Sequence, residues 1–475
     1  MPVPRVLVVG PTLVDIYYIG QPRGLDQTAP IPVINITEAA HGVGGAANAA
    51  STLARLGADT VLVTALAADS AGEICAQCLK QNDVKLASAK TPGYKHAVKN
   101  RLYVGDHLVA RFDSSAEEAN VHDYIRDQFE RAYDSHRPNV VLVSDYGNAV
   151  IDDSVLDTVM RRAAETDTPV IIDPNVRRMH SYKGAYAITP SAQQLAEYAP
   201  NTPVVQAMRS LFRELEPKNV VTTLGAEGAS LLNALMHQNL PAIPTIVRDT
   251  CGAGDAFVAA LAYCVGNRQS MRYAVEYANA AGSAKVGYFG AVPVGAHDVL
   301  RKEIVSLGSA AKELSLEEAL RMRKSVKISK GKFGIANGVF DLMHIGHADM
   351  LRKAAKECDF LLVLVNSDES ASNFKRRPIN SYEVRSLMVA SHPQVSAVLA
   401  LEADDPAKLL ELLEPDVLIK GPDNTIEMTP GASQVVANGG RFVVTTKEHD
   451  ISTTAIIAEH SSKNHTETAT TDIGT

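Results

Sequence analysis

Short apolar runs that end in glycine or in polar residues recur through the first part of the chain. VLVVG at Val6–Gly10 is the first of them, and TVLVT, NVVLVSDYG, PVIIDPN, YAITPS and NVVTTLG follow in order. The segments between these runs read as helices. Continuous apolar runs that alternate with helices are typical of a parallel sheet covered on both faces. The pattern therefore predicts a doubly wound α/β domain over residues 1–304.

Two polar segments of this domain do not fit the buried-strand pattern. The segment PIPVINITEAAHG alternates as an exposed strand does, and residues 96–113 read as a hairpin around Gly105 and Asp106. Polar side chains on both faces of a hairpin are more typical of a lid or a subunit contact than of a core. We expect a small β lid here, and a homodimer formed through it.

The pattern changes beyond the first domain. Residues 305–332 form a charged segment without a strand signature, which predicts a helical connector. About four strands with intervening helices then predict a smaller, Rossmann-like α/β domain over residues 333–460. Residues 461–475 lack apolar periodicity, and we expect a disordered tail there.

Composition narrows the class of protein without identifying it. The 475 residues exceed what one core holds, a hydrophobic content of 46% is that of a soluble globular protein, and the net charge of −8 argues against nucleic-acid binding. No apolar run has the length of a membrane span, cysteine is sparse and no secretory signal is recognisable, which favours the cytoplasm. The single CxxC, Cys75 to Cys78, has no second pair, so buried thiols are expected rather than zinc.

The stretch DTCGAGDAF at Asp249–Phe257 carries the first candidate chemistry. It follows the extended-looking run PAIPTIV and opens a helix-like run. Its two glycines allow a tight turn that points backbone N–H groups one way, and a helix start adds partial positive charge, which favours a phosphate. Asp255 is placed to take a proton from a hydroxyl that attacks this phosphate. A glycine turn with a helix-capping aspartate is the alternative, and on this stretch alone it is the more common one.

Several upstream positions are candidates for substrate binding. Asp15 follows the first strand, where α/β folds carry ligands, although a loop-stabilising aspartate explains it equally well. Gly44 and Gly45 allow the backbone to approach a small ligand, and Asn48 offers amide hydrogen bonds from a helix start. The glycine spacing here also matches the loose dinucleotide fingerprint. Because that fingerprint belongs directly after the first strand, an NAD-dependent dehydrogenase is the least favoured interpretation.

The sequence HIGH carries the second candidate chemistry. His344 and His347 are three residues apart at what reads as the first turn of a helix, so both lie on one face above the N-terminal amides. Histidines there can hydrogen-bond phosphates. A metal pair and two unrelated surface histidines are the alternatives. Two further segments suit phosphate, namely a basic cluster that begins at Lys375 and the hydroxyl residues Ser452, Thr453 and Thr454.

The first domain resembles the ribokinase family of sugar kinases throughout. The resemblance is carried, in order, by Asp15, GGAAN, VSDYG, IIDPN, TLGAEG and DTCGAGDAF. It implies that Asp255 is the general base on the sugar hydroxyl, and that the sugar is bound by Asp15, Gly44, Gly45 and Asn48. It also implies an ATP and phosphate site made of Ser191, Gln194, Thr223, Gly225, Gly228, Gly252, Ala253 and Gly254.

Residues 333–460 resemble the cytidylyltransferase-like nucleotidyltransferases. The signature is NGVFDLMHIGH, and VNSD, Arg385 and ISTT support it. The resemblance implies that His344 and His347 steady the nucleotide phosphates while a substrate phosphate attacks the α-phosphorus and pyrophosphate leaves. It extends the nucleotide site to Phe340, Lys375, Arg385, Ser452, Thr453 and Thr454.

The two domains in this order resemble the bifunctional heptose kinase–adenylyltransferases, which make ADP-heptose for lipopolysaccharide. The resemblance implies ATP-dependent phosphorylation of the anomeric hydroxyl of heptose 7-phosphate. After a separate phosphatase has removed the 7-phosphate, AMP would pass from ATP to heptose 1-phosphate. Mg²⁺ is expected with ATP at both sites, no metal ligand is assigned, and the partners are ATP and sugar phosphates.

Two departures from the family motifs keep alternatives open. TPSAQQ has Ser191 and Gln194 where the family has asparagine and glutamate near the ATP–magnesium site. KGPDN stands in place of the family's KGGDY in the second domain. The alternatives are a different phosphosugar substrate and an adenylyltransferase with a decayed kinase domain.

Overall fold

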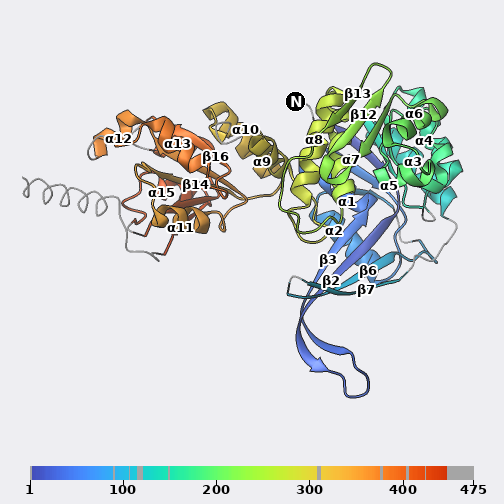
Figure 1. The fold of residues 1–475 in the computed structure, drawn as a ribbon, viewed down its shortest axis with the longest axis horizontal. Coiled ribbons are helices and arrows are strands. Elements are labelled where there is room, and N and C mark those ends of the chain that lie inside the picture. The colour runs from blue at the N-terminus through green and yellow to red at the C-terminus, as the bar shows by residue number, and fades with distance from the viewer. Residues whose placement is uncertain are drawn as a thin grey trace, which may run out of the picture. The chain divides into compact units, whose positions relative to one another are not determined.

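The computed structural model divides the chain into two compact units, residues 1–302 and 303–475, each with its own sheet (Figure 1). The described residues are 3–88, 91–105, 107–114, 121–147, 150–306, 312–374, 378–402, 406–422 and 424–446. The tail predicted at 461–475 lies outside them. The domain boundaries drawn from the sequence remain a prediction.

A nine-stranded sheet forms the centre of the first unit, and the predicted doubly wound α/β fold is confirmed. The strand order is β13 (His237–Leu240), β12 (Ala229–Asn233), β11 (Asn219–Thr223), β10 (Ala187–Ile188), β9 (Val170–Asp173), β8 (Val140–Ser144), β1 (Arg5–Val9), β4 (Asp59–Val63) and β5 (Lys85–Ala87). β12 and β13 are antiparallel, an edge that the sequence did not predict. The run PAIPTIV adds no strand, because its prolines lack the N–H groups that a ladder needs.

Helices cover both faces of this sheet, as the alternation along β1 shows. Val6 and Val8 pack into one core, and Leu7 and Val9 pack into the other. The first core contains α1 (Ala46–Leu56), α2 (Ser70–Gln81), α7 (Ala253–Gly266), α8 (Met271–Lys285) and part of α9 (Ala296–Ser306). The second contains α3 (His122–His136), α4 (Asp153–Glu165), α5 (Ala192–Tyr198) and α6 (Val204–Leu215). α7 is apolar all round, so it is buried between its neighbours.

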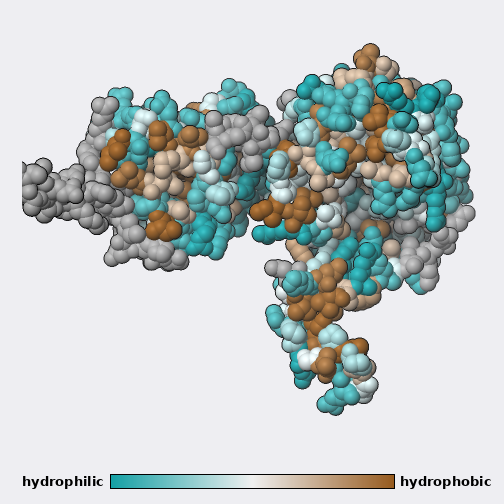
Figure 2. Space-filling model, in the orientation of Figure 1, coloured by the Kyte–Doolittle hydropathy of each residue, from teal (hydrophilic) through white to brown (hydrophobic). Residues whose placement is uncertain are grey.

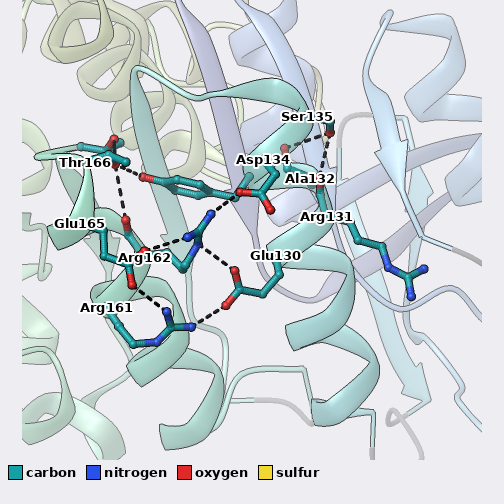
Figure 3. Close-up of polar contacts among 11 residues, drawn as sticks. Glu130, Arg131, Ala132, Asp134, Ser135, Arg161, Arg162, Glu165 and Thr166 are labelled. Carbon is teal, nitrogen blue, oxygen red and sulfur yellow. Dashed lines mark hydrogen bonds and ion pairs between the residues drawn. The ribbon is translucent and has the colours of Figure 1, made fainter.

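Aspartate side chains cap two helix starts, and ion pairs form one surface contact between helices. Asp69 caps α2 by accepting a hydrogen bond from Gly72 N at 3.1 Å, and Asp152 caps α4 through Val155 N at 2.8 Å. α3 and α4 are joined on the surface by ion pairs of Arg161 and Arg162 with Glu130 (Figure 3). Such exposed pairs stabilise a fold only modestly, and this cluster does not form part of a candidate site.

A separate four-stranded sheet forms the predicted lid. Its order is β3 (Pro32–Gly45), β2 (Thr12–Leu25), β6 (Ala97–Val104) and β7 (His107–Ser114). β6 and β7 are the expected hairpin. β2 was not predicted; it begins buried in the first core and ends exposed, and with β3 it projects from the unit as a long hairpin (Figure 1).

A five-stranded parallel sheet forms the second unit and confirms the Rossmann-like expectation. The order is β16 (Ala397–Leu401), β15 (Phe360–Asn366), β14 (Phe333–Gly338), β17 (Val417–Lys420) and β18 (Arg441–Val444). Its helices are α10 (Leu316–Ile328), α11 (Ile345–Ala354), α12 (Asp368–Phe374), α13 (Tyr382–Ala390), α14 (Ala407–Leu413) and α15 (Ala432–Ala437). The strand order reverses between β14 and β17, and at such a switch point an open α/β sheet binds ligands beyond the carboxyl ends of its strands.

α10, which lies in the predicted connector, belongs to the second unit. Arg323 of this helix donates two hydrogen bonds to the carboxylate of Asp416 at 3.0 and 3.2 Å. Nothing in the described part of the chain forms a helix long and apolar enough to cross a membrane.

Candidate active sites

The turn that precedes α7 is held by the side chain of Asp249. Its two carboxylate oxygens accept hydrogen bonds from Cys251 N and Gly290 N, each at 2.9 Å. Gly252 has φ = +77°, and a Cβ there would lie 2.6 Å from Nδ2 of Asn48, so only glycine fits this position. The helix begins at Ala253, and the first N–H groups of a helix have no partner within it. The turn therefore has the geometry that suits an anion, and the phosphate site stays a prediction.

Asp255 lies in the first turn of α7 and is almost fully buried, with 4% of its surface exposed. Asn48 donates to one carboxylate oxygen at 2.8 Å, and the Tyr146 hydroxyl donates to the other at 2.5 Å. Burial raises the pKa of Asp255, while these two hydrogen bonds act in the opposite direction. A carboxylate held in this way is oriented to accept a proton.

A cavity of about 400 Å³ opens beside Asp255. Its lining includes residues that are far apart in the sequence but belong to the predicted ATP site. Of the predicted residues, Ser191, Gln194, Thr223, Gly252, Gly254 and Asp255 line it. Gly225 and Gly228 lie in the turn after β11 and do not line the cavity, and Ala253 is the first residue of α7. The sequence did not single out the lining carboxylates Asp145, Asp173 and Glu197, although two of them end the motifs VSD and IID at strand ends, where ligands are expected.

Ser191 and Gln194, which depart from the family motif, have a structural role at the start of α5. They form a capping box at the start of α5, in which Ser191 N donates to Gln194 Oε1 at 2.7 Å and Gln194 N donates to Ser191 Oγ at 3.2 Å. Gln194 also donates to the Pro174 carbonyl at 2.7 Å. Both side chains therefore fix the wall of the cavity.

Asp173 is a lining residue of this cavity whose carboxyl group has a raised pKa. Protein surrounds its carboxyl group although the cavity keeps it partly accessible, and this burial, followed by the charges of Asp255 and Asp145, raises its pKa to about 8. Asp145 itself is bound by the guanidinium of Arg178 at 2.7 and 2.8 Å. A positive charge close to Asp173 would favour its ionised form.

The predicted sugar-binding residues lie together on the other side of Asp255. Asp15 lies on β2 and not in a loop, because the chain enters the lid sheet directly after β1. It is buried and forms an ion pair with Arg101 of β6. A Cβ at Gly44 would lie 2.9 Å from the Asp15 carboxylate, and one at Gly45 would lie 3.5 Å from the Tyr146 ring. No pattern in the sequence pairs Arg101 with Asp15.

The second site lies at the start of α11, after β14. His344 caps this helix by accepting a hydrogen bond from Gly346 N on Nδ1 at 3.2 Å. Its ring centroid lies 4.0 Å from that of His347. Burial, followed by the neighbouring His344, lowers the pKa of His347 to about 4, and burial also lowers the pKa of His344. Both imidazoles are therefore neutral at neutral pH, and the Nε2 of His344 carries its proton.

Phe340 supports this histidine pair in a strained backbone conformation. Its φ is +54°, which a bulky residue rarely adopts, and its buried ring lies 5.4 Å from that of His347. The next residue, Asp341, accepts hydrogen bonds from Ile379 N and Asn380 N at 2.7 and 3.0 Å. The NGVFD turn therefore links the histidines to the loop that precedes α13.

Arg385 is fully buried within this second site. Its guanidinium donates to the backbone carbonyls of Asn380, Val339 and Asn366 and to the carboxylate of Asp368, at 2.7 to 3.0 Å. In this structure it ties together the loops around the histidines, and contact with a nucleotide phosphate stays a prediction. Lys375, Ser452, Thr453 and Thr454 lie outside the described residues.

Metal-binding clusters are absent from the described residues, where no three His, Cys, Asp or Glu side chains are close enough to hold an ion. Cys75 is buried, and burial raises its pKa to about 12, so this thiol stays protonated. The zinc-free interpretation of the CxxC agrees with this environment.

Two families of known proteins match the two units. Residues 3–296 match the pfkB family of carbohydrate kinases, and residues 335–459 match the cytidylyltransferase-like family. The chain is similar to Bifunctional protein HldE of Campylobacter fetus subsp. fetus, with 30% identity that covers 91% of this chain and 94% of that protein. It is 31% identical to Bifunctional protein HldE of Rhodospirillum rubrum, over 96% of this chain and 94% of that protein.

Solved structures resemble the first unit in fold. Phosphofructokinase-2 from Escherichia coli, in complex with potassium, superposes with a TM-score of 0.56 at 18% identity and covers 64% of this chain and 99% of that one. Arabidopsis thaliana ribokinase, complexed with ribose and ATP, gives 0.50 at 22% identity and covers 63% and 98%.

Proposed function

The chain belongs to the HldE family of bifunctional proteins, with a pfkB carbohydrate kinase followed by a cytidylyltransferase-like domain, and we propose that it uses ATP twice to make ADP-heptose. The kinase transfers the γ-phosphoryl group of ATP to the anomeric hydroxyl of D-glycero-D-manno-heptose 7-phosphate. The second domain transfers AMP from ATP to heptose 1-phosphate and releases pyrophosphate. The observation that carries the proposal is a helix start in each unit that suits a phosphate, one beside a buried aspartate and one beside a histidine pair.

In the kinase step, Asp255 takes the proton of the sugar hydroxyl as its oxygen attacks the γ-phosphorus. The new O–P bond forms while the bond to the ADP oxygen breaks, so ADP is the leaving group. The N–H groups at the start of α7 stabilise the charge that develops on the transferring phosphoryl group. Asn48 and Tyr146 orient the carboxylate, since each donates a hydrogen bond to one of its oxygens.

The sugar lies between Asp255 and the lid. Asp15 and the paired Arg101 offer a carboxylate and a guanidinium to sugar hydroxyls, and Gly44 and Gly45 let the backbone approach the ring. Because Asp15 and Arg101 lie on lid strands, movement of the lid would change the sugar pocket itself.

Mg²⁺ enters this site with ATP. The cavity offers oxygen ligands, Asp173 and Glu197, that suit a hard cation. Burial, followed by the charges of Asp255 and Asp145, raises the pKa of Asp173, and a bound cation would lower it. Bound Mg²⁺ would neutralise charge on the β- and γ-phosphates. Too few protein ligands gather in the described residues to hold the ion alone, which suits a metal that keeps water and phosphate ligands.

In the second step, a phosphate oxygen of heptose 1-phosphate attacks the α-phosphorus of ATP, and pyrophosphate carries away the electrons of the broken bond. His344 and His347 hold the triphosphate by donating hydrogen bonds from neutral rings. Arg385 keeps the surrounding loops in place. Contacts from Phe340, Lys375, Ser452, Thr453 and Thr454 remain part of the proposal.

The lid sheet is proposed as the interface of a homodimer. It carries exposed apolar side chains on strands β2, β3 and β7 and on the turn between β2 and β3, and Figure 2 shows apolar residues gathered on this part of the unit; they include Leu25, Ile31, Ile36, Leu108, Val109 and Phe112. An apolar surface of this kind is typical of a subunit contact.

Because both reactions consume ATP, we place the protein in the cytoplasm.

The division of labour is tested with one variant in each unit. Asp255→Asn keeps the size of the side chain but removes the base, so kinase activity should fall by about 100- to 10,000-fold while adenylyl transfer to heptose 1-phosphate stays unchanged. His344→Ala should do the reverse. The two half-reactions are measured separately by mass spectrometry of the products. Loss of both activities in either variant would contradict the proposal.

A second candidate, a kinase domain that has lost its activity, was favoured by Ser191 and Gln194. The contacts of Asp255 with Asn48 and Tyr146 support an active kinase instead, and ATP turnover by the wild-type protein on a sugar phosphate would rule this candidate out. A panel of sugar phosphates with the wild-type protein tests the remaining alternative, a different phosphosugar.

A further inference from the structure

Lys285, the last residue of α8, is fully buried. Its ammonium group has no hydrogen-bond partner among the described residues, and none of their ion pairs includes it. Burial of an unpaired charge destabilises a fold, and most buried lysines are paired for this reason. We therefore expect the protein to be more stable with an apolar side chain in place of Lys285.

The side chain of Lys285 lies against the anion-binding turn of the kinase site. A Cβ at Gly252 would be 3.5 Å from Cε of Lys285, and a Cβ at Gly282 would be 3.8 Å from the carbonyl oxygen of Ala253. α8 is thus in contact with the start of α7. The three groups that favour the charged form of the lysine, and so oppose the lowering of its pKa by burial, are Asp249, Cys251 and Asp255.

Neither nearby carboxylate forms an ion pair with Lys285. Asp249 accepts from two backbone N–H groups, and Asp255 accepts from Asn48 and Tyr146. The positive charge is therefore not used in an ion pair. In a site from which water is excluded, the field of such a charge extends further than it would in solvent.

We propose that Lys285 is a positioning residue of the kinase, whose buried charge strengthens the hold of the turn Asp249–Gly254 on the transferring phosphoryl group. It acts through the turn and needs no contact with substrate. A charge fixed before the reaction stabilises the negative charge of the transition state without reorganisation. The inference rests on the proposed kinase function and adds a residue to it.

Lys285→Met tests this directly, because methionine fills similar space without charge. We expect kcat of the kinase to fall by about 10- to 100-fold, with a smaller change in KM for the sugar and unchanged adenylyl transfer. We also expect a higher melting temperature, since an unpaired buried charge has been removed. The matched control is Lys302→Met; this lysine of α9 donates to Thr245 and should leave kcat unchanged.

Amine rescue separates charge from shape. In Lys285→Ala, added ethylammonium should restore part of the lost kcat, and tetramethylammonium, which is too large for the space, should not. A wild-type kcat in Lys285→Met would overturn the inference. It would also be overturned if Lys285→Met melted at a lower temperature than wild type and ethylammonium did not restore kcat in Lys285→Ala. An inactive wild-type kinase would refute the proposed function instead, whatever the variants do.

Discussion

Three carboxyl groups, those of Asp145, Asp173 and Asp255, meet at the kinase cavity. Their mutual repulsion acts on Asp173, whose pKa is raised from 3.8 to about 8 by burial and by its two neighbours. A cation that arrives with ATP would lower the pKa of Asp173 and release its proton.

Asp173 should make the stability of the first unit depend on pH. The folded state binds a proton that the unfolded chain has lost, so its contribution to the free energy of unfolding falls as the pH rises from 3.8 to about 8. Asp173→Asn removes this titration. Its melting temperature, relative to wild type, should rise between about pH 5 and pH 8, as measured by thermal unfolding without nucleotide. Parallel curves for the two proteins would contradict the raised pKa.

Side chains at the sites differ in how far the sequence could predict them. Asp255 was found because glycines and a helix start surround it in the chain. Its contact with Asn48 joins residues 207 positions apart, and both were predicted only because each lies in a recognisable motif. Arg101 and Lys285 lie in segments without motifs, and their effect depends on partners that only the folded chain brings near.

At the scale of elements, the sequence pattern predicted one part of the lid and missed another. The β6–β7 hairpin was predicted from its turn around Gly105. β2 was missed because its pairing with β3 shifts register between Ile19 and Gly20 and again between Pro22 and Gly24. Such bulges interrupt the alternation that identifies a strand.

The lid surface should hold two copies of the chain together. Leu108 on β7 is 51% exposed, and Leu108→Asp would place a charge in the proposed interface. We expect light scattering to give a dimer for wild type and a monomer for this variant. Leu235→Asp, at a leucine 92% exposed outside the lid, is the control and should stay dimeric. A monomeric wild type would rule out the proposed dimer.

At the scale of the whole molecule, each unit carries a complete set of the residues proposed for one reaction. The order of the two domains could be read from the sequence, because each has its own run of strands and its own motif. The sequence could not show that α10 belongs to the second unit. Its charged surface resembles a connector, and only the folded chain shows that Arg323 binds Asp416.

Separate sites lead to a prediction about mixtures. Because the 7-phosphate must be removed between the two reactions, the intermediate has to leave the protein. Equal amounts of Asp255→Asn and His344→Ala, with a heptose bisphosphate phosphatase present, should therefore form ADP-heptose at a rate within about twofold of that of half the amount of wild type. Mass spectrometry of ADP-heptose over time measures this. A mixture that forms no product would show that the intermediate passes within one molecule.

The position of β1 has a consequence for how the chain is made. This first strand pairs with β4 on one side and with β8 on the other. β8 leaves the ribosome roughly 130 residues after β1, a delay on the order of ten seconds at usual rates of synthesis. During this time an apolar strand keeps one unpaired edge in the nascent chain. An unpaired apolar edge can pair with another chain, so the kinase half is exposed to aggregation while it is being translated.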